Sequence, residues 1–354
     1  TAAQDGKVVL KNRAQIENDS EGSFTIKKDN NGNVDWNYTG GIVQAQNAIF
    51  KNCRKAVAFL SYHNFHPITG ATSNNISYFK NCVFETTQQL NDLNANLDDH
   101  VSLYDVQGIQ FLGCDFSNTA PPGANQGIIQ NGIRSIDAAY KVSSLCLSST
   151  LPCSNSKSCT FSNLNYGIYA TNSNPLFKVT VSNSTFTNNR YDGIHLKGIN
   201  YPTVYSCNFD VGNYSQLSSG VYIDNCKYYL IQKNQFYTST SGGGSVGIWV
   251  NDSKNGAHEI YNNTFTGLAA GIMTLNDNSG MSNYADGLRM NCNTFVGNTY
   301  DIGITGSIAN NNSIALVQGS NSGTATDLVR NHYSALCGNE NQFFIAGSSK
   351  QVIH

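Results

Sequence analysis

Ionisable side chains that could act on a sugar polymer gather in the middle of the chain, at Asp192, His195, Lys197, Asp224 and Asp252. Hydrolysis of a glycosidic bond needs two carboxyl groups roughly 5 to 10 Å apart. A polysaccharide lyase would instead need clustered acids to hold Ca²⁺, together with an Arg or Lys base. If the protein is an enzyme, these five residues are its catalytic candidates.

The same residues also have a structural explanation. Lys197, Asp224 and Asn251 each follow a Gly by four residues, which predicts one column of a repeated structure. A Lys–Asp pair in such a column is typical of a solvated cross-strand ion pair. A further acid-rich segment, Asp98-Asp99-His100, could hold a metal ion or form a polar turn. We predict no cofactor, and Ca²⁺ would enter only with the lyase alternative.

A second set of candidates follows the Gly-Ile and Gly-Val pairs that recur along the chain. Side chains alternate between the two faces of a strand, so an inward Ile or Val is followed by an outward residue. The outward column predicted in this way is Arg134, Tyr169, His195, Tyr222, Trp249, Met273 and Thr305.

This column of rings and amphipathic side chains, at about 4.8 Å per step, has two functional interpretations. In one, the rings from Tyr169 to Trp249 stack on sugar faces. In the other, the column meets a neighbouring subunit or domain, where Tyr, Trp, Met and Arg are favoured. The structural alternative is that a loop covers the column, or that cross-strand stacking of the rings only stabilises the sheet.

Such columns require a repeated structure, and the sequence contains one. An element ending in Asn-x-Phe, Cys-x-Phe or a close variant recurs, with its Phe at Phe50, Phe84, Phe116, Phe161, Phe186, Phe209, Phe236, Phe265 and Phe295. From Phe161 onward the steps are 25, 23, 27, 29 and 30 residues. Apolar and polar residues alternate just before each Phe, which is the period of a β-strand.

A repeat of this length cannot bury its own apolar face, so stacked repeats must share one core. No segment between the repeats has helical spacing, and parallel crossovers are right-handed by default. The sequence therefore predicts an all-β fold, a right-handed single-stranded parallel β-helix of about eleven coils. Gly and Asn suit its corners, and Asn47, Asn81 and Asn183, each three residues before a Phe, suit a hydrogen-bond ladder.

Five of the ten cysteines fall into two groups, which share Cys159. Cys82, Cys114 and Cys159 each lie two residues before a Phe, so they should stack in successive coils. Their expected spacing leaves open both a disulfide and a ladder of buried thiols. Cys146 and Cys153 lie with Cys159 in a Ser-rich loop, where an exported protein would form a disulfide.

Composition excludes two classes of partner. The net charge is −2, the pI is near 6.3 and no basic run is present, so we expect no nucleic-acid partner. No apolar stretch approaches the length of a membrane span. The charged fraction of 12% is about half the roughly 25% of a typical soluble domain, which leaves little material for exposed helices.

No linker divides the chain, so we predict a single domain over residues 1–354. Residues 119–127, 141–160 and 239–245 would be insertions that leave the coils in register. The pattern blurs after Gly303, and residues 303–354 are predicted to form irregular C-terminal coils. Neither end has an obvious cap, and exposed strand edges associate, which predicts a segment of a longer polypeptide or an assembly.

The chain resembles the Asn-rich right-handed β-helix domains of large surface and secreted proteins of Bacteroidota, exported by the type IX system. Residues 6–17, 40–57, 77–84 and 132–138 carry the resemblance. It implies an extracellular or cell-surface location and, commonly, a C-terminal sorting domain that this sequence lacks. It implies no established activity.

Together these observations predict a non-catalytic structural or adhesive module of a large extracellular protein. It would act through assembly with neighbouring domains or subunits, and through contact with a surface or glycan. The alternative is a polysaccharide-active enzyme, a lyase or glycoside hydrolase, on the same scaffold. The binding candidates are Arg134, Tyr169, His195, Tyr222, Trp249 and Met273.

Overall fold

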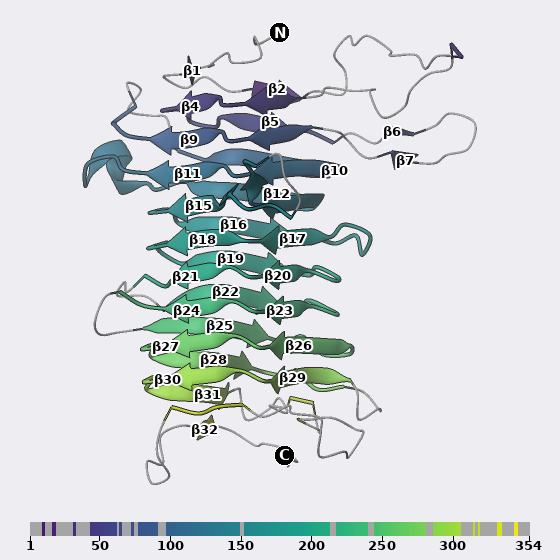
Figure 1. Cartoon of the computed structure of the whole chain (residues 1–354), viewed down its shortest axis with the longest axis vertical. Helices are drawn as coiled ribbons and strands as arrows, with labels where there is room; N and C mark the ends of the chain where they lie inside the picture. The colour runs from purple at the N-terminus through teal and green to yellow at the C-terminus, as the bar shows by residue number, and fades with distance from the viewer. Residues whose placement is uncertain are drawn as a thin grey trace. The chain divides into compact units, whose positions relative to one another are not determined.

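The computed structural model describes residues 9–10, 16–18, 31–32, 43–61, 64–65, 72–73, 77–90, 97–148, 152–212, 217–239, 244–280, 286–305, 314–315, 318, 331–334 and 343–345. Contacts between residues divide the chain into two compact units, Thr1–Thr180 (unit 1) and Val181–His354 (unit 2). Each unit consists of short β-strands, most of them parallel to their neighbours (Figure 1). The organisation of residues 1–354 as a single domain stays a prediction.

Unit 1 contains sixteen of the described strands and one short 3₁₀ helix, η2 (Ala124–Gly127). The strands are β1 (Val9–Leu10), β2 (Ile16–Asn18), β3 (Gln44–Gln46), β4 (Ile49–Lys51), β5 (Val57–Phe59), β6 (Asn64–Phe65), β7 (Thr72–Ser73), β8 (Tyr78–Lys80), β9 (Val83–Thr86), β10 (Asp99–Leu112), β11 (Asp115–Asn118), β12 (Asn131–Ser143), β13 (Leu145–Cys146), β14 (Ser156–Lys157), β15 (Cys159–Ser162) and β16 (Tyr166–Thr171). The next strand, β17 (Val179–Ser182), crosses the boundary between the units.

The described strands of unit 2 are β18 (Ser184–Thr187), β19 (Asp192–Lys197), β20 (Thr203–Tyr205), β21 (Asn208–Asp210), β22 (Ser218–Asp224), β23 (Leu230–Gln232), β24 (Gln235–Tyr237), β25 (Ser245–Asn251), β26 (Ala257–Tyr261), β27 (Thr264–Thr266), β28 (Ala270–Leu275), β29 (Gly287–Asn291), β30 (Thr294–Val296), β31 (Tyr300–Thr305) and β32 (Phe343–Ile345).

Within each unit most strands pair in parallel with their equivalents one coil later, and these strands form three stacks. The Phe sheet contains β4, β9, β11 and β15 in unit 1, and β18, β21, β24, β27 and β30 in unit 2. The ring sheet contains β5, β10, β12 and β16, and then β19, β22, β25, β28 and β31. The third sheet contains β3 and β8, and then β20, β23, β26 and β29. The long strand β10 joins the ring sheet to the third sheet, because it pairs with β5 near its start and with β8 at its end.

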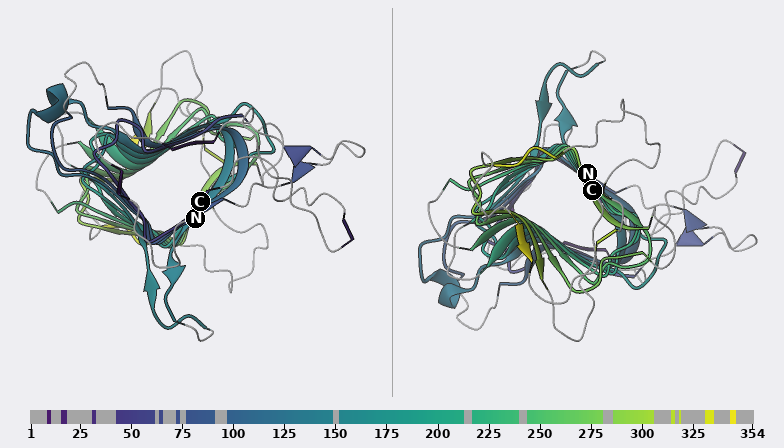
Figure 2. Two further views of the ribbon diagram at one scale, coloured as in Figure 1. Left: turned by 90° about the horizontal axis from the view of Figure 1, so that it is seen from above. Right: turned by 90° about the horizontal axis from the view of Figure 1, so that it is seen from below.

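The predicted fold is confirmed: the chain is all-β, with parallel sheets wound into coils. The coil count stays a prediction. Two antiparallel hairpins interrupt the parallel pattern in unit 1, β6–β7 and β13–β14, and both project away from its sheets (Figure 2). Among the residues that the structure describes, no helix has the length and apolar character needed to cross a membrane.

The recurring Phe residues form the centre of the core. In unit 1, Phe50, Phe84, Phe116 and Phe161 stack face to face at 4.6 Å. In unit 2 the stack from Phe186 to Phe295 has spacings of 4.7 to 5.0 Å. These distances equal the spacing of paired strands, so each coil contributes one ring to a continuous column. Full burial of each ring stabilises the fold by about 2 to 3 kcal/mol.

The Gly of the Gly-Ile pairs is explained by the same Phe column. A Cβ added to Gly247 would lie 2.5 Å from Cδ1 of Phe265 and 2.6 Å from the Gly271 carbonyl oxygen. The corresponding contacts recur at Gly193, Gly220 and Gly271. Glycine is therefore required at this position because the ring of the next coil packs directly against its Cα.

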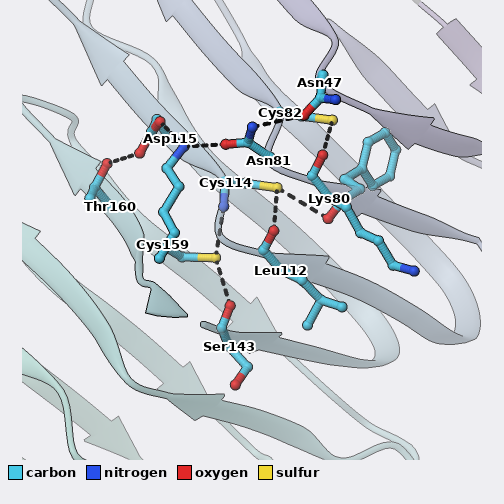
Figure 3. Close-up of polar contacts among 12 residues, drawn as sticks. Asn47, Lys80, Asn81, Cys82, Leu112, Cys114, Asp115, Ser143, Cys159 and Thr160 are labelled. Atoms are coloured by element: carbon cyan, nitrogen blue, oxygen red, sulfur yellow. Dashed lines mark hydrogen bonds and ion pairs between the residues drawn. The ribbon is translucent and has the colours of Figure 1, made fainter. Parts of the chain in front are cut away.

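Left-handed backbone conformations occupy the predicted corners. Asn47, Asn81 and Asn262, each three residues before a Phe, have φ values between 49° and 55°. In unit 1 the predicted side-chain ladder forms at this position, where Asn81 Nδ2 donates to Asn47 Oδ1 at 2.8 Å (Figure 3). Asn tolerates this conformation better than most residues do, because its short polar side chain can bond locally.

A second Asn ladder, which the sequence analysis did not predict, lies one residue further along in unit 2. Asn234, Asn263 and Asn293 are buried, each two residues before a Phe. Nδ2 of Asn234 donates to Oδ1 of Asn263 at 2.9 Å, and Nδ2 of Asn263 donates to Oδ1 of Asn293 at 3.1 Å. Each Oδ1 also accepts the backbone N–H of the preceding ladder residue at 3.0 Å. The ladder therefore satisfies backbone groups that the turn would otherwise leave unpaired.

The insertions are partly described. Residues 119–127 form a loop that ends in η2. Within residues 141–160, β12 runs on to Ser143 and the hairpin β13–β14 follows. A disulfide between Cys146 and Cys153 closes this hairpin; the sequence predicted a disulfide in the cluster with Cys159 but not its pairing. Residues 240–243 and most of residues 306–354, with the predicted irregular coils, lie outside the described residues.

Candidate functional site

Four coils of unit 2 bring the predicted outward residues together. The ring column consists of His195 on β19, Tyr222 on β22, Trp249 on β25 and Met273 on β28, which are direct neighbours in the strand register. All four are half-buried, whereas the Ile or Val before each of them is buried. The predicted alternation of inward and outward residues is confirmed at these positions.

The rings of this column lie nearly parallel to one another. The His195 and Tyr222 centroids are 4.6 Å apart at an interplanar angle of 7°, and those of Tyr222 and Trp249 are 6.4 Å apart at 24°. Trp249 Nε1 is buried without a hydrogen-bond partner among the described residues. The column therefore offers a flat, partly apolar strip at the spacing of the strands.

The prediction that Thr305 continues the column is wrong. Met273 pairs with Gly303, and Thr305 pairs with Leu275. Ile302, not Ile304, is the equivalent of Ile272, so Asp301 takes the position of the repeat Gly. Asp301 is buried there, and its carboxylate accepts hydrogen bonds from the Ser334 N–H at 2.7 Å and from Asn298 Nδ2 at 3.1 Å. A Cβ on Gly303 would overlap Sδ of Met273, so the absence of a side chain makes room for Met273.

A buried carboxylate fixes the first ring of the column. Asp192 opens β19, and its Oδ2 lies 2.8 Å from Nδ1 of His195. Its other oxygen accepts a hydrogen bond from the Ser219 hydroxyl on the next coil. Both Asp192 oxygens therefore have partners, and the imidazole orientation is set by the carboxylate.

Polar side chains contact one another at the ends of β19, β22 and β25. Lys197 Nζ lies 2.9 Å from Asp224 Oδ2, and Asn251 Nδ2 donates to Asp224 Oδ1 at 2.9 Å. The predicted column of Lys197, Asp224 and Asn251 is confirmed by the strand register. Burial, followed by the negative charges of Asp224 and Asp192, raises the pKa of Tyr222 above its usual value.

The acids of unit 2 do not converge on one point. Asp192 begins β19, whereas Asp224 lies beside Lys197 at the other end of that strand. At about 3.3 Å per residue, these ends are about 16 Å apart, which exceeds the roughly 5 to 10 Å of a hydrolase pair. Asp252 lies beyond the end of β25 in a left-handed corner, with φ of 44°, and pairs with Lys254 at 3.6 Å.

Unit 1 carries its own outward pair. Arg134 on β12 is the register neighbour of Tyr169 on β16, and Arg134 is exposed. Tyr169 packs edge-on against Tyr166, with centroids 5.0 Å apart at 66°. Arg134 and Tyr169 are thus adjacent on the ring sheet of unit 1, as predicted.

The segment Asp98-Asp99-His100 is not a turn. Asp99 and His100 begin β10, and their side chains are buried. Asp98 instead forms ion pairs with Arg54 and Lys55 at 3.7 and 3.6 Å. Burial lowers the pKa of His100 to about 3, and burial also raises the pKa of Asp99. Within the described ranges, no group of three or more His, Cys, Asp or Glu side chains could hold a metal ion.

Two exposed apolar features escaped the sequence analysis. On the ring sheet of unit 1, Tyr104 pairs with Ile136, and their side chains are 51% and 39% exposed. In unit 2, Tyr201 and Tyr228 stack at 4.8 Å, and both have φ of 55° at a corner. Only the register makes these residues neighbours, so no motif in the sequence signals them.

Residues 149–335, just over half of the chain, match the family model described as the right handed beta helix region. The chain therefore belongs to this family of right-handed β-helix proteins. None of the curated proteins matches it in sequence.

Solved structures from three sources are similar to the chain. Tailspike protein 3 of bacteriophage CBA120 has a TM-score of 0.38 and 13% identity, over 82% of this chain and 52% of that chain. PfbA, a surface adhesin of Streptococcus pneumoniae, has a TM-score of 0.40 and 13% identity, over 89% and 85%. The A-module of the mannuronan C-5 epimerase AlgE4 of Azotobacter vinelandii has a TM-score of 0.33 and 9% identity, over 88% and 91%. The chain spans about half the length of the tailspike protein.

Proposed function

We propose that this chain is a non-catalytic adhesive module of a larger extracellular protein, and that its unit 2 binds a polysaccharide along the ring column. The observation that carries the proposal is the register of His195, Tyr222, Trp249 and Met273 on four successive strands. Aromatic side chains present large apolar area at little cost in conformational entropy. A repeated strip of such rings suits a ligand that is itself a repeated chain.

The charges around the column favour a neutral polysaccharide. Asp192 is paired with His195, and Lys197 is paired with Asp224. The column therefore carries no surplus positive charge among its described neighbours, and an acidic polymer would gain no electrostatic attraction there. Neutral hexose or pentose polymers are the expected ligands, and polyuronates are not.

Affinity electrophoresis and calorimetry with neutral polysaccharides and polyuronates test this proposal. Tyr222→Ala and Trp249→Ala should each weaken binding of a neutral polysaccharide about 30-fold, the effect of removing an interface anchor worth about 2 kcal/mol. Tyr237→Ala removes an exposed ring from β24 of the Phe sheet and should leave affinity within about twofold. Equal losses in all three variants, or tighter binding of polyuronates, would refute the proposal.

The hydrogen bond between Asp192 and His195 favours one second candidate, a polysaccharide-active enzyme. A carboxylate that orients an imidazole is an arrangement used in general acid–base catalysis. The separation of Asp192 from Asp224 opposes paired-carboxylate hydrolysis. Release of reducing ends or unsaturated sugars by the intact chain, abolished by His195→Gln and retained in Tyr237→Ala, would replace the adhesive proposal with the enzymatic one.

We also propose a cell-surface or extracellular location, with export of the parent protein by the type IX system of Bacteroidota. The disulfide between the exposed Cys146 and Cys153 supports an oxidising compartment. Protease treatment of intact cells should remove the module if it is displayed outside. Persistence of the module until the cells are lysed would contradict this location.

A further inference from the structure

Three cysteines of unit 1 form a ladder of thiols that the ring column does not involve. Cys82, Cys114 and Cys159 are fully buried in consecutive coils, and none of them is in a disulfide (Figure 3). The position that precedes them in the stack is occupied by Ala48, whose carbonyl accepts the Val83 N–H at 2.9 Å. The ladder therefore begins at Cys82.

The backbone register places these sulfurs on one line. The Asp115 N–H donates to the Cys82 carbonyl at 2.9 Å, and the Thr160 N–H donates to the Cys114 carbonyl at 2.9 Å. Equivalent residues on paired strands lie about 4.8 Å apart, inside the roughly 4.4 to 6.8 Å between Cα atoms in disulfides. Cys82 and Cys159 lie two steps apart, about 9.6 Å, which is too far for a bridge. Any disulfide in the ladder must therefore include Cys114.

Both ends of the ladder have a lowered pKa: burial acts to raise the pKa of Cys159, but hydrogen bonds with Cys114 and with backbone groups outweigh it. A hydrogen bond from the Cys114 thiol, with a smaller effect from the Lys157 ammonium, lowers the pKa of Cys82 below its usual value. Burial raises the pKa of Cys114. Lys157 is held nearby, because its Nζ lies 2.7 Å from both Asn81 Oδ1 and Asp115 Oδ2. What distinguishes Cys82 is the fixed charge of Lys157, which acts on it and contacts Asn81, the residue directly before Cys82.

We propose that Cys82 and Cys114 are a redox modification site, at which a small-molecule disulfide converts the two thiols into a bridge between consecutive coils. The Cys82 thiolate attacks R–S–S–R, forms a mixed disulfide and expels RS⁻. Cys114 then loses its proton, and its thiolate attacks the Cys82 sulfur and expels the second RS⁻. Two thiols are oxidised, one R–S–S–R is reduced, and the two protons end on two R–SH. Because both sulfurs are buried, the reaction proceeds through local opening of the coils and is slow.

The test counts thiols in the intact chain after incubation with glutathione disulfide, followed by denaturation, alkylation and peptide mapping by mass spectrometry. The expected result is the loss of two alkylatable thiols and a cross-linked peptide pair that contains Cys82 and Cys114. Cys114→Ser should stop at the mixed disulfide of Cys82, with one alkylatable thiol lost and no cross-linked peptide pair, since Cys82 and Cys159 cannot reach each other. Cys207→Ser, which removes a buried thiol of unit 2, should still lose two.

Two further variants keep the test decisive if Cys114→Ser fails to fold. Cys159→Ser leaves the proposed pair intact and should form the bridge at the wild-type rate. Cys82→Ser should form no bridge to Cys114 on the same timescale. Retention of all three ladder thiols in the wild type, or a bridge between Cys114 and Cys159, would overturn the proposal.

Discussion

Replacement of Asn263 by Leu tests whether the buried Asn ladder of unit 2 holds its coils in register. Leu cannot replace the hydrogen bonds that Asn263 Nδ2 donates to the Ile231 carbonyl at 2.9 Å and to Asn293 Oδ1 at 3.1 Å, or the one that Asn263 Oδ1 accepts from Asn234 Nδ2 at 2.9 Å. It also leaves the Asn234 N–H buried without its acceptor. Three lost side-chain bonds cost about 3 kcal/mol and the unpaired donor about 1 to 3 kcal/mol, so the free energy of unfolding should fall by about 4 to 6 kcal/mol.

Urea denaturation measures the global loss, and amide hydrogen exchange at Asn234 measures it locally. A local loss of about 4 kcal/mol corresponds to about 900-fold faster exchange when opening and reclosing are fast relative to the chemical exchange step. Asn208→Ala, at an exposed position of β21, is the matched control and should change stability by less than about 0.5 kcal/mol. If Asn263→Leu and Asn208→Ala have equal effects, the ladder does not stabilise the fold and this reasoning is wrong.

Three further predictions concern the core. Burial lowers the folded-state pKa of His258 to about 4 from 6.5, so the unfolded chain binds a proton first as the pH falls. Stability is therefore full above pH 6.5 and should fall by about 3 kcal/mol towards pH 4, and urea titrations of His258→Gln should show a smaller pH dependence. Gly247→Ala should destabilise unit 2 by about 1 to 3 kcal/mol, because its Cβ would meet Phe265, and thermal unfolding with the added change Phe265→Leu should recover part of the loss. Formation of the Cys82–Cys114 bridge closes a 33-residue loop and should raise the free energy of unfolding of unit 1 by up to about 4 kcal/mol, measured by denaturation with and without reductant.

The sequence predicted the interior of the coils better than their polar contacts. The Phe repeat and the Gly-Ile pairs were sufficient for the fold, because the ring of Phe265 packs directly against Gly247 and the same contact recurs in the other coils of unit 2. The same pattern misplaced Thr305, because Ile302 and Ile304 both fit the apolar alternation and only the strand pairing distinguishes them. The role of Asn263 in a ladder was not predicted, for a related reason. The residues two and three positions before Phe265 are both Asn, and only the backbone conformation distinguishes their roles.

The candidate site shows the other limit of sequence reasoning. The neighbours His195, Tyr222 and Trp249 were predictable, because one residue per coil at a fixed offset must form a column. The distance between Asp192 and Asp224 is set by the length of β19, and this length is known only once the ends of the strand are known. The sequence therefore identified the candidate acids by their residue type, whereas the distance between them came only from the structure.

Buried and outward-facing side chains alternate along each strand, so the packing of the core also fixes the positions of the outward side chains. For this reason a sheet of the coil can serve as a binding surface. Ile248 packs in the core directly before Trp249, so the contacts that hold the coil in register also fix the place of the ring. A ligand that meets His195, Tyr222 and Trp249 would meet rings already stacked against one another, and little side-chain entropy remains to be lost on binding. Such a surface suits repeated contact with a long polymer better than the enclosure that catalysis on one bond requires.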